Sequence, residues 1–167
     1  VYKRQVTFCP MVQVKTGRDI GFDDFFGYRQ MTPTTLSKTS IKEAHSVAQK
    51  AVHALGLRST SAHIELIRAD DGWKVVEAGA RLGGFRADLH RLTHGIDHPM
   101  NDILVRIPDK VTVPKRGKGY AAAMKFFAQK EGTLKKLSGI KKAKELASFE
   151  KITINKPEVM KITDSQL

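Results

Sequence analysis

The sequence has one cysteine, few aromatic residues and fewer acidic than basic side chains. Cys9 cannot form a disulfide within the chain, which fits a reducing compartment, and we expect a cytoplasmic protein. No run approaches the ~20 apolar residues that a membrane span needs. The start also lacks the apolar core of a signal peptide. We therefore expect neither a disulfide-built secreted domain nor a membrane protein.

The charge balance is strongly basic, with 29 Lys and Arg against 17 Asp and Glu and a net charge of +12. Such a balance suits a nucleic-acid-binding domain, a soluble surface, or a basic cleft for phosphorylated ligands. Basic residues are spread along the chain and no Arg/Lys run alternates with aromatics. The pattern therefore does not favour nucleic-acid binding, which stays an alternative.

The remaining composition, 41% hydrophobic and 28% charged, is that of an ordinary globular protein. The chain carries both strand and helix patterns, and we expect an α+β fold. Two prolines and several charges mark residues 108–118 as a linker. We expect one domain over residues 1–107 and a small β-rich lobe over residues 119–167 that ends unfinished.

Several local signals predict where elements begin and end. An apolar, β-prone stretch predicts a strand over residues 6–14. Ser40 and Glu43 have capping-box spacing and predict a helix that Gly56 ends. A second helix follows residue 84 and ends at Gly95. A third begins at Asp97. In the lobe we expect short strands within residues 120–129, 132–139 and 149–156, a helix near residues 140–146, and a strand that enters a turn over residues 159–167.

Residues 63–84, HIELIRADDGWKVVEAGARLGG, contain two glutamates in what the pattern predicts to be a hairpin. A three-residue loop, Asp70–Gly72, would place Gly72 in a left-handed conformation. That loop pairs Ala69 with Trp73, Ile67 with Val75, and Glu65 with Glu77. A two-residue loop would shift the register and send the two glutamates to opposite faces.

Two carboxylates opposite each other on one face repel unless a cation lies between them or one is protonated. Oxygen ligands of this kind suit Mg²⁺, which keeps several waters and is often shared with substrate phosphates. Glu65 and Glu77 therefore suggest a Mg²⁺ pair, with Mn²⁺ as a substitute ion. Exposed strand residues paired with nearby lysines, or a glycosidase-like acid and base, remain alternatives.

Arg81 and two glycines follow the second glutamate. A guanidinium grips phosphate oxygens in a bidentate manner. Gly83 and Gly84 allow a close backbone approach and lead into a helix N-terminus, which suits an anion. A glycine-rich turn with a surface arginine is the simpler interpretation of each element taken alone.

Other polar residues are further candidates. Arg86 could grip a substrate carboxylate and His90 could line a substrate pocket. His63 shares a face with Glu65 and is either a partner of that carboxylate or a plain strand residue. His90 and His94 have zinc-ligand spacing, but no third ligand completes a pattern. Cys9 has no predicted catalytic role.

The segments SAHIEL, VVEAGARLGG and THGID together resemble the C-terminal part of the ATP-grasp superfamily of carboxylate–amine ligases, in the branch of amino-acid ligases and carnosine-synthase-like enzymes. The family pattern is H-x-E, then E-x-N-x-R-x-G-G. The resemblance covers roughly residues 6–167 and implies half of an ATP-grasp domain, an antiparallel sheet with flanking helices, followed by a β-rich lobe.

The resemblance implies that Glu65 and Glu77 bind Mg²⁺ and ATP phosphates. It implies that Arg81 stabilises the transferring phosphoryl group, and that Gly83 and Gly84 shape the acceptor pocket. Gly79 departs from the pattern, because the family has asparagine there, and one usual metal ligand is lost.

The implied reaction joins a small-molecule carboxylate to an amine through an acyl-phosphate, at the expense of ATP. The family's ATP-clasping lysines and adenine-contacting segment lie upstream of the matching part. We therefore expect a fragment that is itself inactive, from a longer ligase. A non-catalytic nucleotide-binding relative is the alternative that the glycine at position 79 supports.

Overall fold

A computed structural model of the chain describes residues 5–107, 109–128, 131–133, 135–154 and 159–160. The chain divides into two compact units, one within residues 1–15 and 29–124 and one within residues 16–28 and 125–167. The boundaries expected from composition, 1–107, 108–118 and 119–167, stay a prediction.

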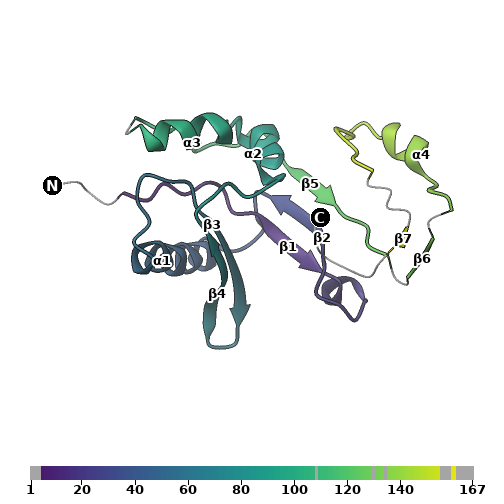
Figure 1. Ribbon diagram of the computed structural model, residues 1–167, viewed down its shortest axis with the longest axis horizontal. Coiled ribbons are helices and arrows are strands. Elements are labelled where there is room, and N and C mark those ends of the chain that lie inside the picture. Colours follow the sequence, from purple (N-terminus) through teal and green to yellow (C-terminus); the bar gives the residue numbers. More distant parts are fainter. Residues whose placement is uncertain (1–4, 108, 129–130, 134, 155–158, 161–167) are drawn as a thin grey trace. The chain divides into compact units, whose positions relative to one another are not determined.

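The first unit contains a three-stranded sheet, a hairpin and three helices (Figure 1). The hairpin packs against α1, and α2 packs against the edge strand β5, which runs antiparallel to β2. Antiparallel strands with flanking helices confirm the expected α+β class. The elements are β1 (Gln13–Thr16), β2 (Gly27–Thr32), α1 (Lys38–Ala54), β3 (His63–Ala69), β4 (Gly72–Gly79), α2 (Arg86–His94), α3 (His98–Arg106) and β5 (Ala121–Met124).

Local capping residues set the ends of these helices. Gly56 and Gly95 follow α1 and α2 with positive φ angles of 64° and 68°, as predicted. Asp97 caps α3, because its carboxylate accepts a hydrogen bond from the Met100 backbone at 2.9 Å. The predicted capping box of α1 is wrong. Ser37, three residues earlier, is the N-cap and accepts from the backbone of Ser40.

In the hairpin β3–β4 the two glutamates pair as predicted, but the loop and register that produce this pair differ from the predicted ones. Its loop is the two residues 70–71, so Ala69 pairs with Gly72, and the predicted three-residue loop is wrong. A β-bulge between Glu65 and Leu66 then compensates, because one extra residue on β4 shifts the register back. Glu65 therefore pairs with Glu77, which confirms that pair.

The strand predicted over residues 6–14 is mostly wrong, since β1 begins only at Gln13. Pro10 lacks a backbone N–H for a ladder, and its carbonyl oxygen lies 2.7 Å from Nε2 of His90 instead.

The second unit contains a short 3₁₀ helix, η1 (Arg18–Ile20), the paired strands β6 (Gly132–Thr133) and β7 (Val159–Met160), and α4 (Ile140–Lys144). Phe127 packs against Phe26 and Tyr28, with ring centroids 4.9 Å apart in both pairs. A strand was predicted over residues 149–156, but residues 149–154 form none, and residues 155–156 lie outside the described residues. Of the strand predicted over residues 159–167, only Val159–Met160 is described, as β7.

None of the helices in the described part of the chain is both long and apolar enough to cross a membrane.

Candidate functional site

The hairpin presents Glu65 and Glu77 on one face. Residues directly opposite in an antiparallel pair share a face and have neighbouring side chains, and these two residues are such a pair. Their side chains are 40% and 51% exposed. Two acidic groups that would repel each other are therefore held together, but with open access to a ligand.

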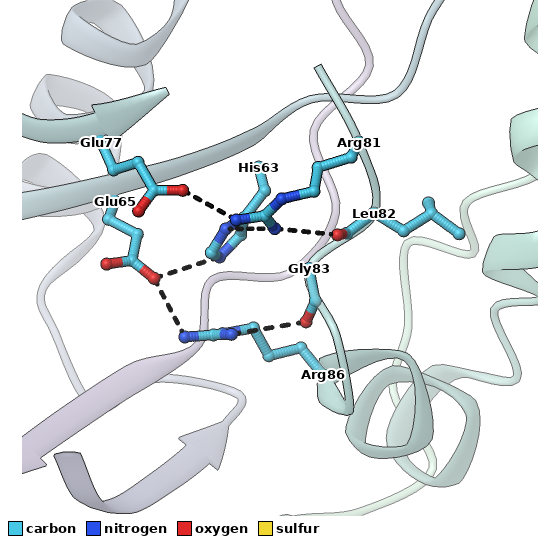
Figure 2. Close-up of polar contacts among 7 residues, drawn as sticks. All are labelled: His63, Glu65, Glu77, Arg81, Leu82, Gly83 and Arg86. Carbon is cyan, nitrogen blue, oxygen red and sulfur yellow. Dashed lines mark hydrogen bonds and ion pairs between the residues drawn. The ribbon is translucent and has the colours of Figure 1, made fainter. Parts of the chain in front are cut away.

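Each glutamate forms an ion pair with one arginine (Figure 2). Oε1 of Glu77 lies 2.8 Å from Nη2 of Arg81, which comes from the loop after β4. Oε1 of Glu65 lies 3.1 Å from Nη2 of Arg86, the first residue of α2. Two positive charges thus offset the two negative ones, and the repulsion expected between the glutamates is relieved within the chain.

The two arginines differ in burial. The Arg81 side chain is 58% exposed and also donates to the Leu82 carbonyl at 3.1 Å. Arg86 is only 18% exposed, and burial lowers its pKa despite the opposing effect of Glu65. The exposed pair adds little stability, so Arg81 can exchange its partner for a ligand at low cost.

His63 lies between the two ion pairs, which the sequence left undecided. Its side chain is 14% exposed, with Nε2 3.6 Å from Oε1 of Glu65 and Nδ1 3.5 Å from Nη1 of Arg81. Burial, and then the charge of Arg86, lower the pKa of His63, which favours a neutral ring. The alternation of β3 gave the available signal, since His63 and Glu65 share a face.

Gly79, Gly83 and Gly84 differ in what a side chain at each position would contact. A Cβ on Gly83 would lie 2.8 Å from Cδ2 of His63, closer than real contacts allow. Gly84 has a positive φ of 52° with open space around it. A Cβ on Gly79 would lie 3.4 Å from Cγ of Arg81, an ordinary contact, so a side chain there would touch that arginine.

The other histidine candidates make their contacts elsewhere. Both ring nitrogens of His90 are engaged, Nδ1 with His98 and Nε2 with the Pro10 carbonyl, each at 2.7 Å. Nδ1 of His94 lies 2.8 Å from the Thr93 hydroxyl. Burial raises the pKa of Cys9 to about 11, so its thiol is protonated at neutral pH and a poor nucleophile.

The carboxylates of Glu65 and Glu77 could supply only part of the ligand shell of a hard cation. Among the described residues, no group of three or more His, Cys, Asp or Glu side chains is arranged to hold a metal ion. Mg²⁺, however, commonly takes one or two carboxylates and completes its shell with substrate phosphates and water. The paired, half-exposed carboxylates of Glu65 and Glu77 match that requirement.

Comparisons with solved structures identify the fold. The phosphoribosylglycinamide synthetase of Anaerococcus prevotii matches with a TM-score of 0.67 at 21% identity, over 95% of this chain. The L-amino acid ligase of Bacillus licheniformis matches with a TM-score of 0.66 at 22% identity, over 76% of this chain. Both are ATP-grasp carboxylate–amine ligases. The chain has an ATP-grasp fold. The fold that the motifs imply is confirmed.

This ATP-grasp chain matches only part of each relative. It covers 40% of the synthetase and 33% of the ligase. It is also 31% identical over 120 residues to the uncharacterized protein y4rH of Sinorhizobium fredii, of which it spans 25%. No protein-family model matches the chain. The relatives thus support the fold, whereas the activity of the whole protein must be argued from the site.

Proposed function

We propose that the protein containing this chain is an ATP- and Mg²⁺-dependent carboxylate–amine ligase. The observation that carries the proposal is the pairing of Glu65 with Glu77 beside the guanidinium of Arg81. Phosphoryl transfer needs little covalent chemistry from a protein. It needs positioning and neutralisation of the phosphate charge, which carboxylate-held Mg²⁺ and arginine supply.

Glu65 and Glu77 would hold the metal ion, which would neutralise phosphate charge when bound. Gly79 stands where the family pattern has asparagine, so water or a substrate oxygen would complete the shell. We therefore expect weaker metal binding before the nucleotide arrives than a three-ligand site would give.

Arg81 would leave Glu77 and bind the transferring phosphoryl group, because phosphate offers it a bidentate partner. In the first step the substrate carboxylate oxygen attacks the γ-phosphorus, and ADP leaves. In the second the amine nitrogen attacks the acyl carbon, phosphate leaves, and the nitrogen loses a proton. Arg86, Gly83 and Gly84 would contact the acid and its acyl-phosphate.

The test is isothermal titration of the full-length protein with Mg-ATP, together with phosphate release on a panel of acids and amines. We expect binding in the wild type and a loss of about tenfold or more in Glu77→Gln, which keeps the shape but removes one metal ligand. Glu43→Gln, on the exposed part of α1, is the control. Binding that Glu77→Gln leaves unchanged contradicts the proposal.

Gly79 favours one second candidate, a non-catalytic nucleotide-binding relative. Such a protein would bind Mg-ATP and still release no phosphate with any acid and amine. Gly79→Asn separates the two, because restoring a third ligand should raise metal affinity in either case but phosphate release only in a ligase.

A further inference from the structure

We propose that His63 is the positioning residue of this site. It would hold Arg81 through its imidazole, and it requires glycine at position 83. The inference rests on the proposed function for its kinetic readout. Its structural readout is independent of that function.

His63 contacts one member of each ion pair (Figure 2). Nε2 faces Glu65 of the Glu65–Arg86 pair at 3.6 Å, and Nδ1 faces Arg81 of the Glu77–Arg81 pair at 3.5 Å. A guanidinium can only donate, so Nδ1 must be the acceptor and the ring proton belongs on Nε2, which points at the carboxylate. One neutral tautomer therefore satisfies both neighbours.

This arrangement gives the exposed arginine a preferred orientation. Arg81 is 58% exposed and its partner Glu77 is 51% exposed, so this ion pair alone holds it weakly. The ring that faces it is only 14% exposed, which restricts its movement. When Arg81 leaves Glu77 for a phosphoryl oxygen, the contact with Nδ1 can persist and keep the guanidinium aimed at the reacting group.

Gly83 leaves the space that the imidazole of His63 occupies. A Cβ at this position would lie 2.8 Å from Cδ2 and 3.3 Å from Nε2 of His63, and 3.2 Å from Cδ of Arg86. Its φ is not positive, so the requirement is for space and not for backbone freedom. A methyl group there would push on the imidazole that faces Glu65 and Arg81. Gly84, with open space around it, imposes no such limit.

The kinetic test uses His63→Ala, His63→Asn, Gly83→Ala and the double variant of His63→Ala with Gly83→Ala. We expect His63→Ala and Gly83→Ala each to lower kcat about tenfold or more with little change in KM for Mg-ATP. His63→Asn keeps an acceptor near the Nδ1 position and should retain most of kcat. His53→Ala, exposed on α1, is the control.

The double variant distinguishes positioning from general damage. If Gly83→Ala acts by displacing the imidazole, it should cost nothing further, within about twofold, once the ring is gone. Costs of the two substitutions that simply multiply contradict the proposal. If His63→Ala fails to fold, His63→Asn and Gly83→Ala still give opposite expected results.

The second readout is the ¹⁵N spectrum of the Arg81 guanidinium in protein labelled on arginine, assigned with Arg81→Lys. We expect restricted rotation in the wild type and in His63→Asn, and faster averaging in His63→Ala and Gly83→Ala. A wild type without phosphate release overturns the ligase and leaves this readout intact. An Arg81 signal unchanged by His63→Ala overturns the positioning role.

Discussion

At the residue scale, His90 has a buried ring that finds a partner for each nitrogen in its neutral state. Nε2 donates to the Pro10 carbonyl and Nδ1 accepts from Nε2 of His98, each at 2.7 Å. Burial, as the main cause, lowers the pKa of His90 to about 4. Its ordinary value near 6.5 applies in the unfolded chain. The unfolded chain therefore binds the additional proton first as the pH falls.

Stability should consequently fall between pH 6.5 and 4, because the depressed pKa of His90 gives a contribution that is complete above 6.5. We expect a loss on the order of 2 kcal/mol across this window, measured by urea unfolding with the fluorescence of Trp73, the one tryptophan. His90→Gln should flatten this dependence, whereas the exposed His53→Gln should not. An equally steep profile in His90→Gln assigns the loss to other groups.

At the element scale, the hairpin depends on one turn residue. Gly72 has a φ of 117°, a conformation that side-chain-bearing residues rarely adopt, and no atom lies within 4 Å of a Cβ there. Gly72→Ala should therefore destabilise the chain by about 1–2 kcal/mol through backbone strain alone. Gly119→Ala is the matched control, because Gly119 also has open space but no positive φ. Equal unfolding midpoints in urea contradict this expectation.

The same hairpin shows what the sequence could predict. The Glu65–Glu77 pair was predicted from a three-residue loop that the hairpin does not have, whereas the capping roles of Gly56, Gly95 and Asp97 followed from local chemistry. The β-bulge did not, since a two-residue loop with a bulge and a three-residue loop without one produce the same glutamate pair. Neither Val75 nor Val76 carries a local sequence signal that favours the two-residue loop with a bulge over the three-residue loop.

The ion pairs of the site were not predicted from the sequence. Arg81 lies four residues after Glu77, and we assigned it to phosphate and not to this glutamate. The pairing of Glu65 with Arg86 spans 21 positions and depends on the path of the loop after β4. That path also places Gly83 against His63, which no pattern in the sequence indicates.

At the scale of the whole molecule, the net charge of +12 and the half-exposed site predict different salt dependences for ATP binding. A basic surface attracts polyphosphates without specificity, and salt screens that attraction. A metal-assisted site should keep more of its affinity at high salt and depend on both glutamates. Raising the salt concentration therefore separates the two modes in a titration of the 167-residue chain.

We expect the 167-residue chain alone to bind Mn²⁺ weakly and to release no phosphate from ATP, because it matches only 33–40% of the ligases that share its fold. The proposed ligase function predicts that the full-length protein releases phosphate when an acid and an amine are present. Mn²⁺ binding, followed by electron paramagnetic resonance, should weaken about tenfold or more when both Glu65→Gln and Glu77→Gln are introduced.

Lys141→Gln and Lys142→Gln in α4 should lower only the salt-sensitive part of ATP binding. Phosphate release by the isolated chain would show that the part described here suffices for catalysis, and Mn²⁺ binding that survives both glutamate substitutions would remove the metal from this hairpin.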